Sequence, residues 1–245
     1  IERLLKREGT VHVLVREGSR GRFEEMRSGW GDDGDRVVPV IGDLSQANLG
    51  LDAERIAELK GKIDAFYHLA AIYDMEADEE TIRVGNIEGT INAVDLANEL
   101  EVGCFNHVSS IAAAGLFKGT WREEFFDEAE NLDKHPYFRT KHESERIARE
   151  RTTVPWRVYR PGIVVGDSET GQMDKIDGPY YFFKLIQKLR DILPPWAPTI
   201  GIEGKEINVV PVDFVADAID HISHLPEKDE MVFHLTDPKP LRAGQ

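Results

Sequence analysis

The sequence predicts an α/β fold built on a doubly wound parallel sheet. The prediction rests on short apolar runs that alternate with segments of helical spacing along most of the 245 residues. The runs are almost continuously apolar, which is typical of parallel strands covered on both faces. Ligands of such sheets bind beyond the carboxyl ends of the strands, so the residues that follow each strand are candidates for a functional site.

Strands and helices are expected to alternate along the chain. The expected strands are Val11–Val15, Val37–Ile41, Ala65–Ala70, Cys104–Ser109 and Arg157–Tyr159. Residues 53–59 and 86–100 carry apolar side chains at helical spacing and predict helices between the strands. We also expect a helix over residues 1–8, closed by Gly9, and another over 213–224 with Asp213 as its N-cap.

The composition changes at about Gly166, where glycine, proline and aromatic residues become frequent. We therefore predict a main domain over residues 1–166, and a smaller lobe over 167–245 that covers the cleft and returns elements to the main domain. Residues 180–193 predict a basic amphipathic helix, which can pack on the protein itself, flank an apolar tunnel or lie on a membrane. Packing on the protein is the commonest of these roles, and membrane contact is the weakest alternative.

Composition excludes several classes of protein. With 30 basic and 45 acidic residues the formal charge is −15, which argues against general binding of nucleic acid. The single cysteine, Cys104, cannot form an internal disulfide, so we expect a cytoplasmic location. No apolar stretch approaches the roughly 20 residues that cross a bilayer. His68 and His107 fall within strands and lack further ligands nearby in the sequence pattern, so no metal site is expected.

Tyr137 and Lys141 stand four residues apart in a helical segment, so their side chains share one face. An adjacent ammonium stabilises a phenolate and lowers the pKa of a tyrosine, which makes Tyr137 a candidate general acid. Taken alone, such a pair is common on ordinary helices. Ser110 follows the strand ending near Val108 and could donate a hydrogen bond to a substrate carbonyl, although a serine there can equally serve a turn. Ser110, Tyr137 and Lys141 in this order are a far more specific signal than the serine alone or the pair of Tyr137 and Lys141 alone.

Arg16 follows the strand Val11–Val15, where the adenosine ribose of a dinucleotide is usually bound. An arginine there suits the 2′-phosphate of NADP, whereas an acidic residue would suit NAD. NADPH is therefore the expected cofactor. Asp43 and Leu44 close the next strand and are placed to contact the adenine, with a plain turn aspartate as the alternative for Asp43.

The segments VIGDLS, YHLAA, NIEGT, HVSS, YFRTK and YRPGIVVG occur in this order, and together they resemble the extended short-chain dehydrogenase/reductase superfamily. The resemblance runs from the first residue to about Phe233 and implies a Rossmann-type sheet with a C-terminal substrate lobe. It implies that the main domain binds the dinucleotide, that Asn86 lies beside the active site, and that Lys141 also binds the nicotinamide ribose. The implied lining of the dinucleotide site is Leu69, Ala70 and Ala71, with Pro161, Gly162, Ile163 and Val164 at its nicotinamide end.

Four longer segments, among them HVSSIAAAGLFKG and FRTKHESE, look like bacterial alcohol-forming fatty acyl-CoA reductases. That resemblance implies reduction of a long-chain acyl-CoA through a fatty aldehyde to a fatty alcohol with NADPH. It also implies that this chain is an amino-terminal reductase module with a second reductase module in the same polypeptide. The first strand and the glycine-rich turn of the superfamily would precede Ile1, and we expect the sequence to be a fragment that lacks them.

Two alternatives remain open at this point. A sugar-nucleotide epimerase or dehydratase uses a similar set of serine, tyrosine and lysine with tightly held NAD, but Arg16 argues against it. A dinucleotide-sensing module without turnover usually lacks the tyrosine and lysine pair, and both residues are present here.

Overall fold

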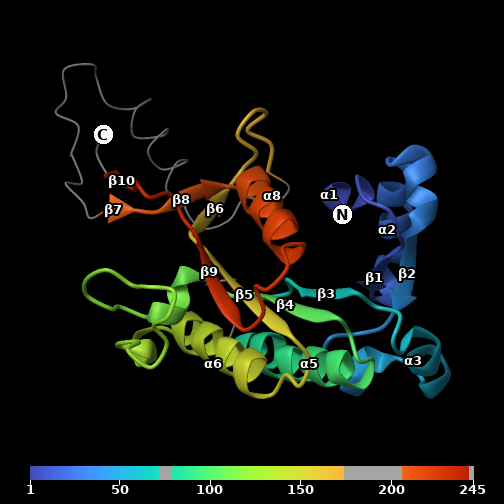
Figure 1. The fold of residues 1–245 in the computed structure, drawn as a ribbon, viewed down its shortest axis with the longest axis horizontal. Helices are drawn as coiled ribbons and strands as arrows, with labels where there is room; N and C mark the ends of the chain where they lie inside the picture. The colour runs from blue at the N-terminus through green and yellow to red at the C-terminus, as the bar shows by residue number, and fades with distance from the viewer. Residues whose placement is uncertain (72–78, 174–205, 243–245) are drawn as a thin grey trace.

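A computed structural model describes residues 1–71, 79–173 and 206–242, and these residues form a parallel α/β fold (Figure 1). The main sheet has the strand order β3-β4-β5-β9, and neighbouring strands in it are parallel. Its strands are Ala65–His68 (β3), Cys104–Val108 (β4), Trp156–Pro161 (β5) and Met231–Leu235 (β9). A second parallel pair consists of Val11–Val15 (β1) and Val37–Ile41 (β2).

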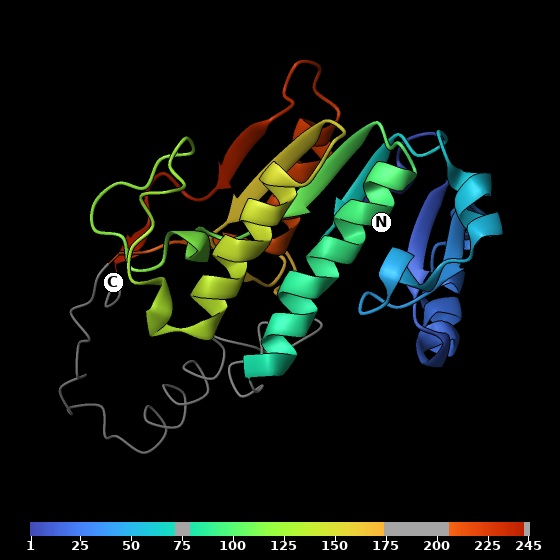
Figure 2. The same ribbon diagram turned by 90° about the horizontal axis from the view of Figure 1, so that it is seen from below.

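Helices cover both faces of the main sheet, which confirms the doubly wound arrangement. In Figures 1 and 2, α5 (Gly89–Glu99) and α6 (Pro136–Glu150) lie on one face, and α8 (Val212–Ser223) lies on the other. Alternate residues of the strands face opposite layers. Phe105 accordingly belongs to the apolar core beneath α5 and α6, whereas Tyr159 packs with Val215 and Ile219 of α8.

Shorter elements connect these layers. The helices are α1 (Glu2–Leu5), α2 (Arg20–Ser28), α3 (Ala53–Leu59) and α4 (Glu79–Arg83). A π-helical turn, η4 (Val84–Glu88), precedes α5 and interrupts the helix expected over 86–100. The 3-10 turns are η1 (Glu17–Ser19), η2 (Gly31–Arg36), η3 (Ala47–Gly50), η5 (Ile111–Ala114) and η6 (Leu132–Lys134).

Among the described residues the sheet is divided between β1 and β3, which do not pair. Two ion pairs connect the two parts: Arg3 of α1 binds Asp217 of α8 at 2.7 Å, and Arg7, which follows α1, binds Asp220 of α8 at 2.8 Å. The β1 and β2 layer is thus attached to the helix on one face of the main sheet.

The chain after Gly166 contributes strands to two small sheets and also contributes elements to the main sheet. Beyond β5, β6 (Ile163–Val165) pairs with β8 (Val209–Pro211), and β7 (Glu206–Ile207) pairs with β10 (Leu241–Arg242). Both α8 and β9 pack on the main sheet. The division of the chain into domains at residue 166 stays a prediction, and the amphipathic segment 180–193 lies outside the described residues.

Two predicted helix ends were wrong. α1 ends at Leu5, because the Arg36 guanidinium donates hydrogen bonds to the carbonyls of Leu5, Arg7 and Gly9 and so replaces helical partners. α8 begins at Val212 with Pro211 as its N-cap, so Asp213 is not the cap. The Asp213 carboxylate instead accepts hydrogen bonds from the amide and the hydroxyl of Ser168, at 2.9 and 2.6 Å.

Candidate active site

The carboxyl ends of β3, β4 and β5 bring three of the predicted segments to the same edge of the sheet. Leu69 follows β3 with 58% of its surface exposed, Ser110 follows β4, and Gly162 follows β5. These strands are parallel neighbours in register, so the residues after them project in one direction. Ala70 is exposed and Ala71 is half-buried. An apolar surface therefore lies at the end of β3, where the resemblance places the dinucleotide.

Lys141 lies on the buried face of α6 with 4% of its surface exposed. Its Nζ donates a hydrogen bond to the carbonyl of Val108, the last residue of β4, at 3.1 Å. Burial lowers the pKa of Lys141 to about 8, and the negative charge of Glu145 opposes that shift. The structure thus holds an amine of reduced basicity against the strand end that precedes Ser110.

Tyr137 lies in the first turn of α6, one turn before Lys141. The chain starts a helix here because Pro136 suits its first position and the His135 Nδ1 accepts a hydrogen bond from the Tyr137 amide at 3.1 Å. Tyr137 is half-buried. α6 packs on η5, which begins directly after Ser110, and a ring nitrogen of His142, the residue after Lys141, lies 3.0 Å from the carbonyl oxygen of Ala113 in η5.

The two serines after β4 have different partners. The Ser109 hydroxyl is buried and donates to Glu145 at 2.7 Å. The Ser110 hydroxyl caps η5, where it accepts a hydrogen bond from the Ala112 amide at 3.1 Å. A serine hydroxyl that accepts still has its own hydrogen to donate. Of these two residues, Ser110 is therefore the one suited to donate to a substrate oxygen.

Asn86 lies in the π-helical turn η4, a conformation that often occurs at functional sites. It is 2% exposed, and its amide donates to the Thr140 hydroxyl of α6 at 3.2 Å. The Thr90 hydroxyl donates to the Asn86 carbonyl at 2.6 Å and contacts His68 Nε2 at 3.0 Å. The Thr90 hydroxyl donates its only hydrogen to Asn86, so it must accept the hydrogen bond from His68. The proton of the neutral His68 imidazole is therefore on Nε2. Asn86 thus links η4 to the helix that carries Lys141.

Two stacked imidazoles lie beneath this region of the sheet, and their buried pairing was not predicted from the sequence. His68 and His107 occupy paired positions of β3 and β4, with ring centroids 5.4 Å apart. Burial, and then the charge of Lys141, lower the pKa of His68 to about 3. Burial also lowers the pKa of His107 well below its ordinary value. Within the described residues neither ring nitrogen of His107 has a hydrogen-bond partner, and both histidines are neutral at pH 7.

The predicted adenosine end lies after β1 and β2. The Arg16 side chain is 74% exposed, and its Nε lies 3.8 Å from a carboxylate oxygen of Asp43. Asp43 also serves its own turn, because its carboxylate accepts hydrogen bonds from the amide and hydroxyl of Ser45, which lower its pKa. Leu44 is half-buried against α5, where a Cβ on Gly89 would lie 2.7 Å from its Cδ2. Arg16 therefore has a guanidinium available to an anion.

The predicted nicotinamide end is a close crossing of two backbones. The Gly162 amide donates to the carbonyl of Leu235 at 3.0 Å, and the Ile163 amide donates to the carbonyl of Asn208 at 2.8 Å. A Cβ at Gly162 would lie 2.8 Å from that Asn208 carbonyl, so glycine is required. Pro161 ends β5, while Val164 lies in β6. Segment 161–164 thus runs from the main sheet to the smaller β6 and β8 sheet.

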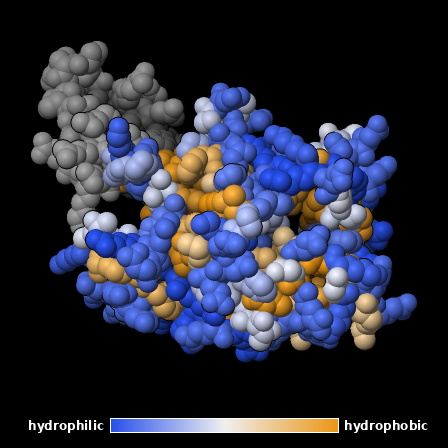
Figure 3. Space-filling model, in the orientation of Figure 1, coloured by the Kyte–Doolittle hydropathy of each residue, from blue (hydrophilic) through white to orange (hydrophobic). Residues whose placement is uncertain are grey.

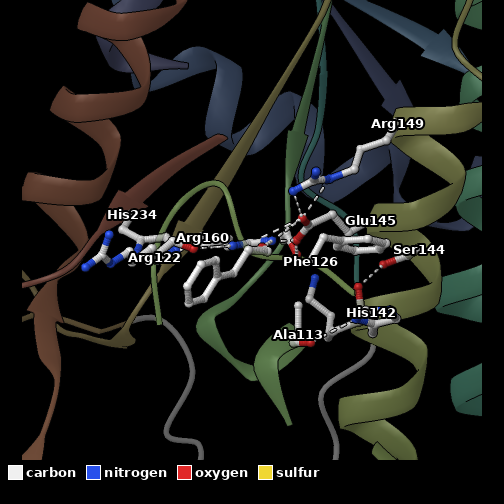
Figure 4. A network of polar contacts seen from close by, with 12 residues as sticks. Ala113, Arg122, Phe126, His142, Ser144, Glu145, Arg149, Arg160 and His234 are labelled. Atoms are coloured by element: carbon white, nitrogen blue, oxygen red, sulfur yellow. Dashed lines mark hydrogen bonds and ion pairs between the residues drawn. The ribbon is translucent and has the colours of Figure 1, made fainter. Parts of the chain in front are cut away.

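A buried ionic network lies behind the strand ends, and the sequence analysis did not identify it (Figure 4). Glu145 and Arg160 are both fully buried and form an ion pair at 2.7 Å. Arg149 binds the same carboxylate at 2.7 Å. Burial raises the pKa of Glu145, but the hydrogen bonds and charge of Arg160, with the charge of Arg149, outweigh burial and lower the pKa. The only signal of this network in the sequence is the presence of charged residues within FRTKHESE and YRPG.

The same network holds the segment between η5 and α6. Arg160 donates to the carbonyl of Phe125 at 2.8 Å, and its guanidinium lies 5.2 Å from the ring centroid of Trp121. Phe126 lies between the imidazole of His142, with centroids 4.2 Å apart, and the guanidinium of Arg149 at 4.5 Å. The aromatic residues after Ser110 are therefore bound to α6 and β5.

Residues 1–71, 79–173 and 206–242 contain no group of three metal-binding side chains. In the same ranges no helix is long and apolar enough to span a membrane.

This fold and the strand-end site define an extended short-chain dehydrogenase/reductase, an oxidoreductase class whose fold binds a nicotinamide dinucleotide. The family model NAD_binding_4, described as "Male sterility protein", matches residues 1–219, and the chain belongs to this family. The resemblance to fatty acyl-CoA reductases within it is a finer prediction.

Relatives include one of the subunits of linear gramicidin synthase from Brevibacillus parabrevis, 30% identical over 210 residues, and aldehyde reductase lnaA of Aspergillus flavus, 28% identical over 217 residues. Each match covers 83% of this chain, but only 4% and 20% of the respective relatives. The terminal R domain of the myxalamid PKS-NRPS pathway has a TM-score of 0.82 and 28% identity, over 99% of this chain and 62% of that domain. The chain thus spans less than two thirds of each of these relatives.

The fold also occurs in UDP-glucuronic acid 4-epimerase from Bacillus cereus, solved with NAD, with a TM-score of 0.69 and 18% identity. That alignment covers 99% of this chain and 75% of the epimerase, and it shows the fold alone.

Proposed function

We propose that this chain reduces the carbonyl of a fatty acyl-CoA, a fatty aldehyde or both with NADPH, toward the fatty alcohol. The observation that carries the proposal is the buried Lys141, whose ammonium is bound to the strand end before Ser110 and lies one turn from Tyr137. A buried lysine near a tyrosine and a hydroxyl donor, at the carboxyl edge of a Rossmann-type sheet, suits reduction of a carbonyl.

Each residue has a distinct role in this proposal. NADPH, when bound, supplies the hydride. Ser110 donates a hydrogen bond to the carbonyl oxygen and stabilises the negative charge that develops there. Tyr137 donates a proton to the same oxygen, and the Lys141 ammonium stabilises the phenolate that results. With a thioester, the tetrahedral adduct instead collapses, expels a thiolate and leaves an aldehyde, which a second reduction converts to alcohol.

The residues present fit two parts of the dinucleotide. The exposed guanidinium of Arg16 suits the 2′-phosphate, with Asp43 and Leu44 beside it. Lys141 suits the nicotinamide ribose, because its Nζ is held at the strand end. Leu69, Ala70 and Ala71 offer an apolar surface, and Asn86 and residues 161–164 complete the proposed site.

We expect Arg16→Ser to weaken the preference for NADPH. The substitution removes the cation that would bind the 2′-phosphate, and charge-assisted hydrogen bonds contribute about 1.5–3 kcal/mol, or roughly 10- to 150-fold in affinity. The dissociation constants of NADPH and NADH, measured by titration, should therefore converge. Arg20→Ser, on the same exposed segment, is the control. An unchanged ratio of the two constants in Arg16→Ser would exclude this role.

An apolar surface near segment 161–164 supports an acyl substrate. Among the described residues Ile163, Val212 and Phe214 are 36%, 44% and 43% exposed. Figure 3 shows apolar side chains gathered over β6, β8 and α8. A long acyl chain can cover such a surface at a gain of about 25 cal/mol per Å². The relative named as an aldehyde reductase supports an aldehyde as substrate.

The test is NADPH oxidation by the full-length protein with decanal, a long-chain acyl-CoA and an acyl group on a carrier protein. We expect oxidation with the fatty aldehyde or the acyl-CoA, and an alcohol or aldehyde product by mass spectrometry. Oxidation with the carrier-bound acyl group alone would change the substrate assigned. Conversion of a sugar nucleotide without net reduction would favour an epimerase. Dinucleotide binding without turnover would favour a sensing module.

In the proposed arrangement a second reductase module of the same polypeptide takes up the aldehyde.

A further inference from the structure

Glu145 joins α6 to the strand ends of the site. It lies one turn after Lys141 and two turns after Tyr137, on the same side of the helix. The carboxylate accepts hydrogen bonds from the Ser109 hydroxyl at 2.7 Å and from Arg160 at 2.7 to 3.2 Å. Ser109 follows β4 and Arg160 belongs to β5. One buried side chain of the helix that carries the predicted proton donor therefore binds both the residue that follows β4 and a residue of β5 (Figure 4).

Two side chains of α6 bind the two residues that precede Ser110. Lys141 Nζ donates to the carbonyl of Val108, and the Glu145 carboxylate accepts from the hydroxyl of Ser109. Ser110 is bonded covalently to Ser109, so its distance from α6 depends on these contacts. The Ser109 bond is the more rigid of the two, because its acceptor is also held by Arg160 and Arg149.

Glu145 also contributes a negative charge near Lys141. The titratable and charged groups near Lys141 include Tyr137 and Glu145 from α6, His68 from β3 and His107 from β4. Arg149 of α6 and Arg160 of β5 bind the Glu145 carboxylate. Both histidines are neutral at pH 7, so Glu145 supplies the negative charge. That charge raises the pKa of Lys141, which burial alone would lower further.

We propose that Glu145 is a positioning residue: through Ser109 it fixes the strand end that carries Ser110 relative to Tyr137 and Lys141, and it places a negative charge one turn from the Lys141 ammonium. The inference rests on the proposed reduction for its effect on rate. Its effect on Lys141 can be measured without turnover.

The first test is Ser109→Ala in the full-length protein, which removes one hydrogen bond and leaves the ion pair of Glu145 and Arg160 intact. We expect kcat to fall about tenfold with KM within about twofold, since small displacements of reacting groups can cost up to about 10²-fold. The matched control is Tyr159→Phe, which removes a buried hydrogen bond of 2.8 Å to Asn106 of β4, on the opposite face of the sheet. Equal loss of kcat in both variants would mean a merely structural role and would overturn the proposal.

The second test measures the titration of Lys141 itself, by NMR of protein labelled at lysine Cε. In Glu145→Gln we expect Lys141 to lose its proton at a lower pH than in the wild type, since the removed charge favours the ammonium and the two arginines remain. The high-pH limb of the kcat profile should move in the same direction. Glu145→Asp keeps the charge and shortens the side chain, so it should preserve the Lys141 titration and still lower kcat.

The outcomes separate the two proposals. A wild-type protein that reduces none of the substrates contradicts the proposed function, while the Lys141 titration still reports on Glu145. A Lys141 titration that is unchanged in Glu145→Gln overturns the positioning role. If Glu145→Gln does not fold, Glu145→Asp and Ser109→Ala decide, and wild-type kcat in both variants overturns the role.

Discussion

Replacing Tyr137 with phenylalanine is expected to lower kcat by about 10²- to 10⁴-fold, the usual contribution of a general acid. The substitution removes the hydroxyl that would protonate the carbonyl oxygen and keeps the ring in the first turn of α6. NADPH binding should be unchanged, because Lys141 and Arg16 remain. Steady-state oxidation of NADPH and equilibrium titration of the dinucleotide measure the two effects separately.

Tyr67→Phe is the matched control for that variant. The Tyr67 hydroxyl makes a hydrogen bond to Ser223 of α8 at 2.8 Å, and it lies on the opposite face of the sheet from α6. Its loss should leave kcat near the wild-type value. Full activity in Tyr137→Phe would contradict the role assigned to that phenol.

Replacing Arg160 with methionine is expected to lower the free energy of unfolding by about 3–5 kcal/mol, the usual effect of removing one partner of a buried ion pair. Glu145 would keep Arg149 but lose its fully buried partner, and the carbonyl of Phe125 would lose its donor. Urea-induced unfolding of the variant and the wild type measures the difference.

Arg151→Met provides the comparison for an exposed pair. Arg151 binds Asp95 at 2.7 Å, but the two side chains are 51% and 39% exposed. Pairs of this kind contribute about 0–1 kcal/mol. A loss in Arg160→Met no greater than the loss in Arg151→Met would show that the buried network does not stabilise the fold.

Much of the fold could be predicted because its strands are short, apolar and bounded by turns. The bounds of β1, β2 and α3 agree with the sequence expectation, while β5 extends beyond Arg157–Tyr159 at both ends. Helix ends were predicted less well, because they depend on tertiary partners. Arg36, far from α1 in the sequence, takes the carbonyls that would have continued that helix.

The positions of the candidate residues could be predicted where they follow from local spacing, while their roles stay a prediction. The helical period alone predicts that Tyr137 and Lys141 share one face of a helix. The end of the apolar strand alone predicts the position of Ser110. The partners of Ser109 could not be predicted, because Glu145 is 36 residues away and reaches it only when α6 packs on β4. Spacing alone likewise gave no reason to pair Glu145 with Arg160, since charged residues are usually on the surface.

Tyr137, Lys141, Glu145 and Arg149 recur at every fourth position of α6, so they form one column along the helix. An α-helix advances by about 100° per residue. One amino acid inserted between Lys141 and Glu145 would therefore turn the second half of the column out of line with the first. The number of residues between the phenol and the carboxylate is thus constrained as strongly as their identities, and length variation should be tolerated only outside this stretch of α6.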